Sequence, residues 1–196
     1  MGTGDSFAAV VLAAGTGSRF GGGKLLADWR GAPLLHAALR AARAAPIASV
    51  TVVTGADAGV VGACARAFDP AIHLVHAPDH AEGMAASLRA GIASLPADTA
   101  GAFVFLGDMP SVPHAVLKPL AEAVAGGAPA AAPVFTGRRG NPVVLGRELF
   151  RDVARLAGDV GARPILQELG ARVALVEAPD DGVLFDVDER TDLSGR

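Results

Sequence analysis

The feature that most constrains the fold is an apolar run that ends in a glycine-rich segment near the start of the chain. Residues 7–13 are continuously apolar, which is typical of a strand buried on both faces of a sheet. Glycines follow at positions 15, 17, 21, 22 and 23, and Lys24 comes directly after them. A buried strand followed by a glycine-rich turn indicates an α/β fold.

Apolar runs and helical spacings alternate along the rest of the chain. Further strands are expected at residues 47–54, 72–76, 102–106, 130–135, 142–145 and 172–176. Helices are expected at residues 33–44, 58–68, 83–95, 113–125, 147–156 and 162–169. The alternation predicts a single domain over residues 1–196, with a mostly parallel mixed sheet and helices on both faces. Residues 1–6 are expected to form a flexible leader, residues 136–141 a polar turn, and residues 180–192 an acidic tail.

Composition and charge argue against several classes of function. The formal net charge of the 196 residues is −3 and the basic residues are dispersed, which argues against a nucleic-acid-binding module. No apolar run approaches the roughly 18 residues of a membrane span, and the N-terminus lacks a signal-peptide pattern, so we expect a cytoplasmic protein. Cys64 is the only cysteine, so neither an intrachain disulfide nor a multi-thiolate metal site is expected.

The glycine-rich segment has the composition of a triphosphate site. Glycines allow positive φ values and close backbone approach, so successive N–H groups can point at phosphate oxygens. Arg19 can bind phosphate oxygens through its forked guanidinium, and Lys24 supplies a mobile positive charge. Leu25 follows Lys24 where the P-loop motif has a hydroxyl, so a metal must be held elsewhere. The alternative is a flexible turn with incidental charges.

Asp108 is the first candidate for that metal, which we expect to be Mg²⁺. It follows the expected strand 102–106 closely, and ligands of parallel sheets bind at the carboxyl ends of the strands. Mg²⁺ prefers carboxylate, phosphate and water oxygens, so one or two carboxylates suffice. Asp186 and Asp188 are two positions apart on an expected strand and so face one side, and we favour Asp188 as second ligand. A helix cap or turn is the alternative for Asp108.

Six motifs in order resemble the molybdenum cofactor cytidylyltransferase family and span nearly the whole chain. They are Leu12-Ala13-Ala14-Gly15 with Arg19, Gly21 and Lys24-Leu25-Leu26, then Gly83-Met84-Ala85-Ala86-Ser87-Leu88, Gly107-Asp108-Met109-Pro110, Gly140-Asn141-Pro142, Gly158-Asp159-Val160-Gly161-Ala162-Arg163 and Phe185-Asp186-Val187-Asp188. The resemblance implies a single Rossmann-like domain with a fold of the nucleotide-diphospho-sugar transferase type. It also implies Mg²⁺-dependent transfer of CMP from CTP to a molybdopterin-type cofactor, with release of pyrophosphate. A recipient molybdoenzyme or its maturation chaperone is the protein partner that it implies.

Residue by residue, the resemblance assigns roles to the first motif and to Asp108. It places the backbone of Leu12, Ala13, Ala14 and Gly15 near the base and ribose of the nucleotide. It implies that Arg19 and Lys24 bind the phosphates and that Asp108 binds Mg²⁺. These three residues are therefore the catalytic candidates. The related guanylyltransferases usually have Leu-Ala-Gly-Gly in the first motif, so the alanine at position 14 favours cytosine over guanine.

The segment that begins at Gly83 is the second candidate for nucleotide binding. An expected helix starts there, so its free N–H groups and the hydroxyl of Ser87 can hydrogen-bond a base edge or the ribose. The guanylyltransferases typically have Gly-Pro-Leu-Ala-Gly in this segment, which again favours cytosine here. An ordinary helix start is the alternative. His80 and Glu82, just before it, could line the pocket, but a place in a surface loop is favoured.

Three residues further along are candidates for binding the acceptor. Arg138 and Asn141 belong to an expected basic hairpin tip that can receive the pterin phosphate, and Arg163 is expected to face the substrate. Asp159 is expected to cap the helix that starts near residue 162. An exposed turn and a simple helix cap are the alternatives.

Two other functions remain open from the sequence. One is a different pyrophosphorylase of the same fold, which makes a guanylylated cofactor or an activated sugar or alditol. The other is a protein without catalytic activity that delivers the cofactor to a molybdoenzyme. The joint presence of Arg19, Lys24 and Asp108 favours an enzyme.

Overall fold

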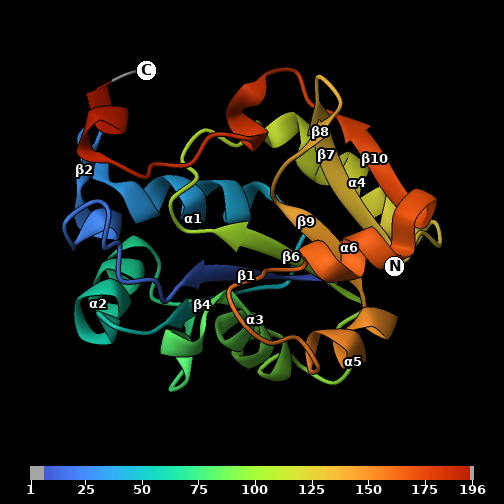
Figure 1. Cartoon of the computed structure of the whole chain (residues 1–196), viewed down its shortest axis with the longest axis horizontal. Helices are drawn as coiled ribbons and strands as arrows, with labels where there is room; N and C mark the ends of the chain where they lie inside the picture. The colour runs from blue at the N-terminus through green and yellow to red at the C-terminus, as the bar shows by residue number, and fades with distance from the viewer. Residues whose placement is uncertain (1–6, 195–196) are drawn as a thin grey trace.

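The computed structural model describes residues 7–194, so the expected leader at residues 1–6 lies outside the described residues. Eight strands form one sheet in the order β10-β7-β9-β6-β1-β4-β5, with β8 paired to β7 (Figure 1). The strands are β1 (Phe7–Ala13), β4 (Ser49–Thr54), β5 (His73–His76), β6 (Gly101–Leu106), β7 (Ala130–Phe135), β8 (Arg138–Arg139), β9 (Val143–Gly146) and β10 (Val173–Glu177). A separate small sheet pairs β2 (Asp28–Trp29) with β3 (Ala32–Pro33).

The strand directions confirm the predicted mixed, mostly parallel sheet. Strand β1 pairs in parallel with β4 and β6, and β4 pairs in parallel with β5. Strand β9 runs antiparallel to β6 and β7, whereas β10 runs parallel to β7. The carboxyl ends of β1, β4 and β6 therefore meet at one edge of the sheet, which is where ligands of such sheets bind.

Helices cover both faces of this sheet, as predicted (Figure 1). One face carries α1 (Leu34–Ala44), α2 (Ala58–Phe68) and α4 (Leu117–Ala125). The other face carries α3 (Met84–Ala93), α5 (Phe150–Val153) and α6 (Arg163–Leu169). Among residues 7–194, none of the helices has the length and apolar character needed to cross a membrane.

Strand β1 shows why the sheet is apolar on both faces. All seven of its residues are buried. Ala9 and Val11 pack on the side of α1 and α2, whereas Val10 and Leu12 pack on the side of α3 and α6. Successive residues of a strand point to opposite faces, so a strand between two helical layers must be continuously apolar.

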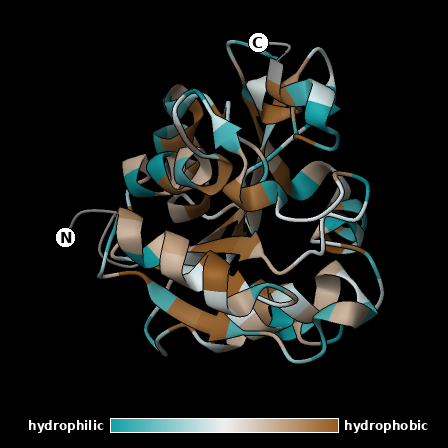
Figure 2. Cartoon of the chain, turned by 90° about the vertical axis from the view of Figure 1, so that its left-hand side faces the viewer, coloured by the Kyte–Doolittle hydropathy of each residue, from teal (hydrophilic) through white to brown (hydrophobic). Residues whose placement is uncertain are grey.

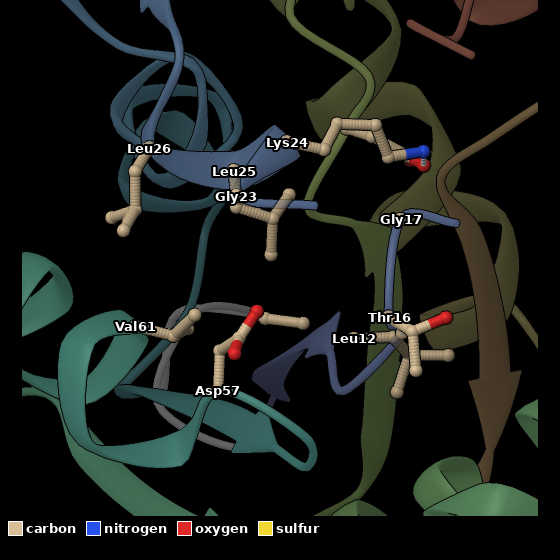
Figure 3. A pocket seen from close by; sticks show the side chains of 12 residues that line it. Leu12, Thr16, Gly17, Gly23, Lys24, Leu25, Leu26, Asp57 and Val61 are labelled. Atoms are coloured by element: carbon tan, nitrogen blue, oxygen red, sulfur yellow. Dashed lines mark hydrogen bonds and ion pairs between the residues drawn. The ribbon is translucent and has the colours of Figure 1, made fainter. Parts of the chain in front are cut away.

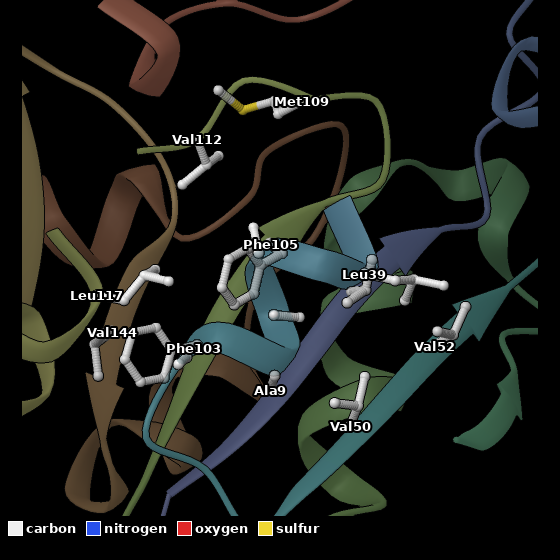
Figure 4. Close-up of a cluster of buried hydrophobic side chains, with 14 of the residues drawn as sticks. Ala9, Leu39, Val50, Val52, Phe103, Phe105, Met109, Val112, Leu117 and Val144 are labelled. Atoms are coloured by element: carbon white, nitrogen blue, oxygen red, sulfur yellow. The ribbon is translucent and has the colours of Figure 1, made fainter. Parts of the chain in front are cut away.

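The largest hydrophobic cluster lies between the sheet and the helices on the side of α1. Phe103 and Phe105 of β6 stack at 5.9 Å between ring centroids, and Leu39 of α1 and Leu117 of α4 lie in the same cluster (Figure 4). Colouring by hydropathy shows the same distribution, with the central strands mostly apolar and the hydrophilic residues mainly on outer helices and loops (Figure 2).

Two expected helices are shorter than the sequence indicates. The helix expected from residue 113 begins as a 3₁₀ turn, and α4 itself starts at Leu117, because the backbone of Pro113 is extended. The helix expected at residues 147–156 consists of a 3₁₀ turn and the four-residue α5. Residues 154–155 form a turn instead of continuing the helix. Directly after this turn, the Arg89 side chain donates to the carbonyl oxygen of Leu156 at 2.5 Å.

The polar turn expected at residues 136–141 is also shorter. Thr136 and Gly137 form the turn, with φ values of 48° and 77°. Two consecutive positive φ values suit the twist of a tight hairpin, so the chain pairs again at once. Arg138 lies opposite Phe135 and Arg139 opposite Val134. The two arginines are therefore strand residues rather than turn residues.

The acidic C-terminal segment returns to the glycine-rich loop. The strand expected around Asp186 and Asp188 is wrong, because residues 185–188 have no regular secondary structure. The segment is held by Val187, which is fully buried in a small cluster with Phe20 and Trp29. The N–H of Val187 also donates to the carbonyl oxygen of Asp108 at 3.0 Å. The two aspartates on either side of Val187 are thereby brought to the edge where β1 and β6 end.

Candidate active site

The glycine loop, which we define as residues 14–23, leaves the carboxyl end of β1 and folds back on itself. The N–H groups of Phe20 and Gly22 donate to the carbonyl oxygen of Gly17 at 3.0 and 3.1 Å. Gly17 has a φ of 59°, and a Cβ there would lie 3.0 Å from the Cβ of Lys24. Glycine at this position therefore allows both the left-handed backbone and the close packing of the loop against Lys24.

Lys24 and Asp108 form the centre of the site. The Nζ of Lys24 lies 2.6 Å from Oδ2 of Asp108. The two segments are joined because the N–H of Gly107 donates to the carbonyl oxygen of Leu12 at 2.9 Å. The side chains are 14% and 23% exposed, so the pair is partly shielded from water and its attraction is stronger than at an open surface.

Arg19 and Asp188 form a second ion pair at the mouth of the site. Their closest atoms, Nη1 and Oδ2, are 2.9 Å apart, and Oδ1 of Asp188 lies 3.8 Å from Nζ of Lys24. Arg19 is 76% exposed, so this pair contributes little stability and can exchange partners easily. Partial burial raises the pKa of the Asp186 carboxyl, and the charges of Asp108 and Asp188 raise it further. Three carboxylates and two cations thus gather at one place.

Asp192 fixes the backbone that carries Asp188. Its Oδ2 accepts hydrogen bonds from the N–H groups of Asp188 and Glu189, both at 2.8 Å. These two bonds lower the pKa of the Asp192 carboxyl. The guanidinium of Arg190 lies 4.7 Å from the ring centroid of Phe20, which joins the same segment to the glycine loop. Asp192 is not among the residues predicted from the sequence, because a carboxylate that binds backbone N–H groups leaves no motif of its own.

The main cleft, of about 610 Å³, lies between the glycine loop and the start of α3. It brings together most of the residues that the sequence singles out, namely Leu12, Ala14, Gly15, Arg19, Lys24, Gly83, Ser87, Asp108 and Asp188. His80 and Glu82 also line it, so the favoured place in an ordinary surface loop is wrong and the alternative, a place in the pocket wall, is confirmed. They lie in a 3₁₀ turn (His80–Glu82) that leads directly into α3 beside the cleft.

Ala13 lies apart from the main cleft. It lines a smaller hollow of about 90 Å³ between the glycine loop and the start of α2. Leu25 and Val61 point into this hollow, and Asp57 lies at its edge (Figure 3). Lys24 extends away from Asp57 there, so its charge is directed to the side of Asp108 (Figure 3).

The N-terminus of α3 does not offer its first N–H groups to a ligand, contrary to the expectation from sequence. Oδ1 of Asp159 accepts from the N–H of Met84 at 3.1 Å, and the carbonyl oxygen of Gly158 accepts from the N–H of Ala85 at 3.2 Å. Asp159 therefore caps α3 and not α6, because the loop that contains it folds over Gly83. Ser87 is buried in the wall of the main cleft.

We expect Gly83→Ala to lower the free energy of unfolding by at least about 2 kcal/mol, because the backbone at this position has a φ of 118° and is crowded. A Cβ there would lie 2.6 Å from the backbone N of Asp159. Gly127→Ala is the matched control, since Gly127 has a φ of 105° but no atom within 4 Å of its Cβ position. Urea unfolding measures the free energy of unfolding of both variants, and the difference between them gives the effect of crowding at position 83. Equal losses of stability in the two variants would contradict this effect.

A second cleft of about 380 Å³ adjoins the main cleft. Leu12, Met84, Leu106 and Asp159 line both clefts, so the two share one wall. Its floor is apolar, with Val104, Val143 and Leu166, and its polar residues include Asn141, Arg163 and Gln167.

The arginine that reaches the second cleft is Arg139 and not Arg138. Arg138 is exposed on β8 and lines neither cleft, whereas Arg139 lines the second and donates to the carbonyl oxygen of Leu166 at 3.1 Å. Adjacent strand residues point to opposite faces, so recognition of β8 would have identified the correct arginine. Asn141 is anchored through its N–H, which donates to the carbonyl oxygen of Val183 at 2.8 Å.

The carboxylates of the site could share a metal with a substrate. Within residues 7–194, no three or more His, Cys, Asp or Glu side chains are grouped so as to hold a metal ion by themselves. Asp108, Asp186 and Asp188 nevertheless surround the same cleft. A divalent ion would therefore take one or two of these carboxylates and complete its coordination with phosphate and water oxygens.

Residues 9–173 match the family model described as the MobA-like NTP transferase domain. The chain belongs to this family. MobA-like NTP transferases are nucleotidyltransferases, and the main cleft of this one lies at the carboxyl ends of β1 and β6. Membership of this family confirms the predicted fold and the predicted class of enzyme, a nucleotidyltransferase.

Curated relatives of this MobA-like NTP transferase include two bifunctional GlmU proteins. The GlmU of Kineococcus radiotolerans is 35% identical over 156 residues, which cover 78% of this chain and 31% of the relative. A GlmU of Cereibacter sphaeroides is 37% identical over 157 residues, covering 74% of this chain and 33% of the relative. The chain thus spans about a third of the length of these relatives.

Solved structures share the fold over nearly the whole chain. Rv0371c of Mycobacterium tuberculosis superposes with a TM-score of 0.81 at 30% identity, covering 96% of both chains. A complex of Rv0371c with manganese gives a TM-score of 0.71 at 27% identity over 88% of both chains. The molybdopterin-guanine dinucleotide biosynthesis protein A of Archaeoglobus fulgidus gives 0.71 at 18% identity over 95% of both chains, a likeness of fold alone.

Proposed function

We propose that this MobA-like NTP transferase transfers CMP from CTP to the phosphate of a molybdopterin-type cofactor and releases pyrophosphate. The observation that carries the proposal is the position of Lys24 and Asp108. They lie 2.6 Å apart at the carboxyl ends of β1 and β6, in the wall of a cleft of about 610 Å³. A second cleft for an acceptor adjoins it.

The two ion pairs explain how the site receives a triphosphate. Lys24 forms an ion pair with Asp108, and Arg19 forms one with Asp188. Phosphate oxygens would take the place of the carboxylates as partners of the cations, which frees the carboxylates for a metal. The exchange keeps every charge of the partly buried site paired, and an unpaired charge there would be costly.

Transfer then requires positioning and neutralisation of charge. An oxygen of the acceptor phosphate forms a bond to the α-phosphorus of CTP, and the bond from this phosphorus to the bridging oxygen breaks. Pyrophosphate leaves with the electron pair of the broken bond. Lys24 and Arg19 stabilise the charge that develops on the α-phosphate and on the leaving group, without a covalent enzyme intermediate.

Asp108 and Asp188 would hold the divalent ion, for which we propose Mg²⁺. The donor set fits, since carboxylate oxygens are preferred by Mg²⁺. Partial burial raises the pKa of the neighbouring Asp186 carboxyl, and the negative charges of Asp108 and Asp188 raise it further. The manganese complex of the related Rv0371c supports a divalent ion in such a fold. A bound ion neutralises part of the triphosphate charge.

Asp192→Ala should raise the Mg²⁺ concentration needed for half-maximal activity by about 10- to 100-fold, because the backbone of Asp188 loses its anchor. Asp192→Asn should recover part of this loss, since its amide oxygen still accepts from the two N–H groups. Asp180→Ala is the control, because Asp180 likewise accepts from a backbone N–H, that of Gly182 at 2.8 Å, away from Asp188. Metal titrations that coincide for the Asp192→Ala variant and wild type would contradict this role.

Cytosine is favoured by the tight packing of Ala14 in the wall of the main cleft. A Cβ at Gly55 would lie 2.5 Å from the carbonyl oxygen and 2.8 Å from the Cβ of Ala14, so the two residues are packed as tightly as glycine permits. The methyl group of Ala14 fills space that a glycine would leave for a larger purine. We therefore propose that the base is a pyrimidine.

The second cleft suits a flat, polar acceptor with a phosphate. Its apolar floor can contact a ring system, and the amides of Asn141 and Gln167 can hydrogen-bond ring nitrogens and oxygens. Arg163 supplies a positive charge for the phosphate. These properties match a molybdopterin-type cofactor. The resemblance to the cytidylyltransferase family supports a recipient molybdoenzyme or its maturation chaperone as the next partner.

Product analysis tests the proposal against its alternatives. The protein is incubated with Mg²⁺ and each of the four NTPs, together with molybdopterin or a sugar phosphate, and the products are identified by mass. A product heavier by one CMP unit, formed from CTP and molybdopterin, is expected. A GMP adduct would replace the proposal with guanylyl transfer, and a nucleotide sugar with pyrophosphorylase activity. Binding of molybdopterin without pyrophosphate release from any NTP would indicate a delivery protein.

A further inference from the structure

His80 lies where the base of a nucleotide would enter the main cleft. It lines that cleft together with Ala14 and Ser87. Its ring is packed over Gly55, because a Cβ on that glycine would lie 2.7 Å from Cγ of His80 and 2.5 Å from the carbonyl oxygen of Ala14. His80 and Ala14 thus form neighbouring parts of one wall.

The hydrogen bond of His80 fixes which ring nitrogen faces outward. Nδ1 lies 3.0 Å from the carbonyl oxygen of Ala77. A carbonyl oxygen only accepts, so Nδ1 must carry the hydrogen. In the neutral ring, Nε2 then has a lone pair and acts as an acceptor. Nε2 is on the far side of the ring from Nδ1, and it therefore points away from the buried Ala77.

We propose that Nε2 of His80 accepts a hydrogen bond from the 4-amino group of the cytosine base, which makes His80 a residue that determines nucleotide specificity. This inference rests on the proposed use of CTP. Uracil presents a carbonyl oxygen where cytosine has the amino group. In UTP that oxygen would face the lone pair of Nε2, so one hydrogen bond is lost and two acceptors repel each other.

The half-buried position of His80 makes this discrimination effective. A fully exposed acceptor could bind water when uracil is present and would discriminate little. A ring held between Gly55 and the Ala77 carbonyl cannot turn away without losing its own hydrogen bond. A site built to bind a substrate N–H rejects the analogue that lacks it.

Binding of CTP and UTP to the whole chain, measured by calorimetry with Mg²⁺ and without acceptor, tests the inference. Wild type should bind CTP at least about tenfold more tightly than UTP. His80→Phe keeps an aromatic ring but removes the acceptor, so the CTP affinity should fall and the ratio should drop to within about threefold of unity. His73→Phe is the control, because His73 is exposed at the start of β5, away from the cleft, and should leave the ratio unchanged.

His80→Gln gives a second readout that keeps the test valid if the phenylalanine variant is unstable. Its amide can turn, so that the oxygen accepts from cytosine or the NH₂ donates to uracil. UTP should therefore bind more tightly than to wild type, with CTP affinity largely kept. If the wild type prefers CTP and both His80 variants keep the same ratio of CTP to UTP affinity, the role of His80 is overturned while the proposed use of CTP stands. A wild type that prefers GTP to CTP would overturn the proposed nucleotide and this inference with it.

Discussion

Lys24→Ala should lower kcat by about 100- to 1,000-fold, the usual loss when one preorganised charge is removed from a developing oxyanion. The Nζ atom of Lys24 is within 4 Å of both Asp108 and Asp188, and the Lys24 side chain is only 14% exposed, so water cannot replace its charge well. The KM for CTP should change less than kcat if Lys24 acts mainly on the transition state. Steady-state pyrophosphate release with saturating acceptor measures both constants.

Lys118→Ala is the matched control for this variant. Lys118 is 78% exposed on α4, where it pairs with Glu122 at 3.6 Å. Its loss removes the same charge from the chain without touching the site. Equal turnover of Lys24→Ala and wild type, with both proteins folded by circular dichroism, would remove Lys24 from the mechanism.

Asp108→Asn should lower kcat by about 1,000-fold, through loss of the metal and not of the fold. The amide is of the same size and can still accept a hydrogen bond from Lys24, but it is a poor ligand for Mg²⁺. A higher Mg²⁺ concentration should recover part of the activity. Lys24→Ala should not respond to metal in this way, so the two variants separate the two roles.

Asp98→Asn is the control for the second variant, since Asp98 is exposed in the turn before β6, at the other end of that strand from Asp108. Mn²⁺ binding measured by electron paramagnetic resonance in the presence of CTP gives an independent readout. Affinity for Mn²⁺ equal to that of wild type in Asp108→Asn would show that the metal is held by other residues.

The strands and the glycine loop were predictable because their causes are local. The continuous apolar run of β1 is dictated by its burial between two layers of helices, and its bounds are as expected. Four of the five glycines of the loop have positive φ values, namely Gly17, Gly21, Gly22 and Gly23. Asp108 follows from the rule that ligands bind where parallel strands end.

The remaining parts of the site depend on contacts between distant segments. Asp159 caps a helix that begins 75 residues earlier, and no local pattern distinguishes it from a cap of its own helix. The sequence predicts an acidic tail around Asp188, because local sequence does not reveal the tertiary contact that buries Val187 with Phe20. Only the folded chain shows that this segment completes the site.

Transfer from CTP labelled at either the α- or the γ-phosphate tests most directly whether the ion-paired cleft performs nucleotidyl transfer. Attack at the α-phosphorus, with Lys24 and Arg19 on the phosphates and Asp108 on the metal, predicts that α-label appears in the acceptor product and γ-label in pyrophosphate. Appearance of γ-label in the acceptor would mean phosphoryl transfer and would contradict the proposed reaction at its central step.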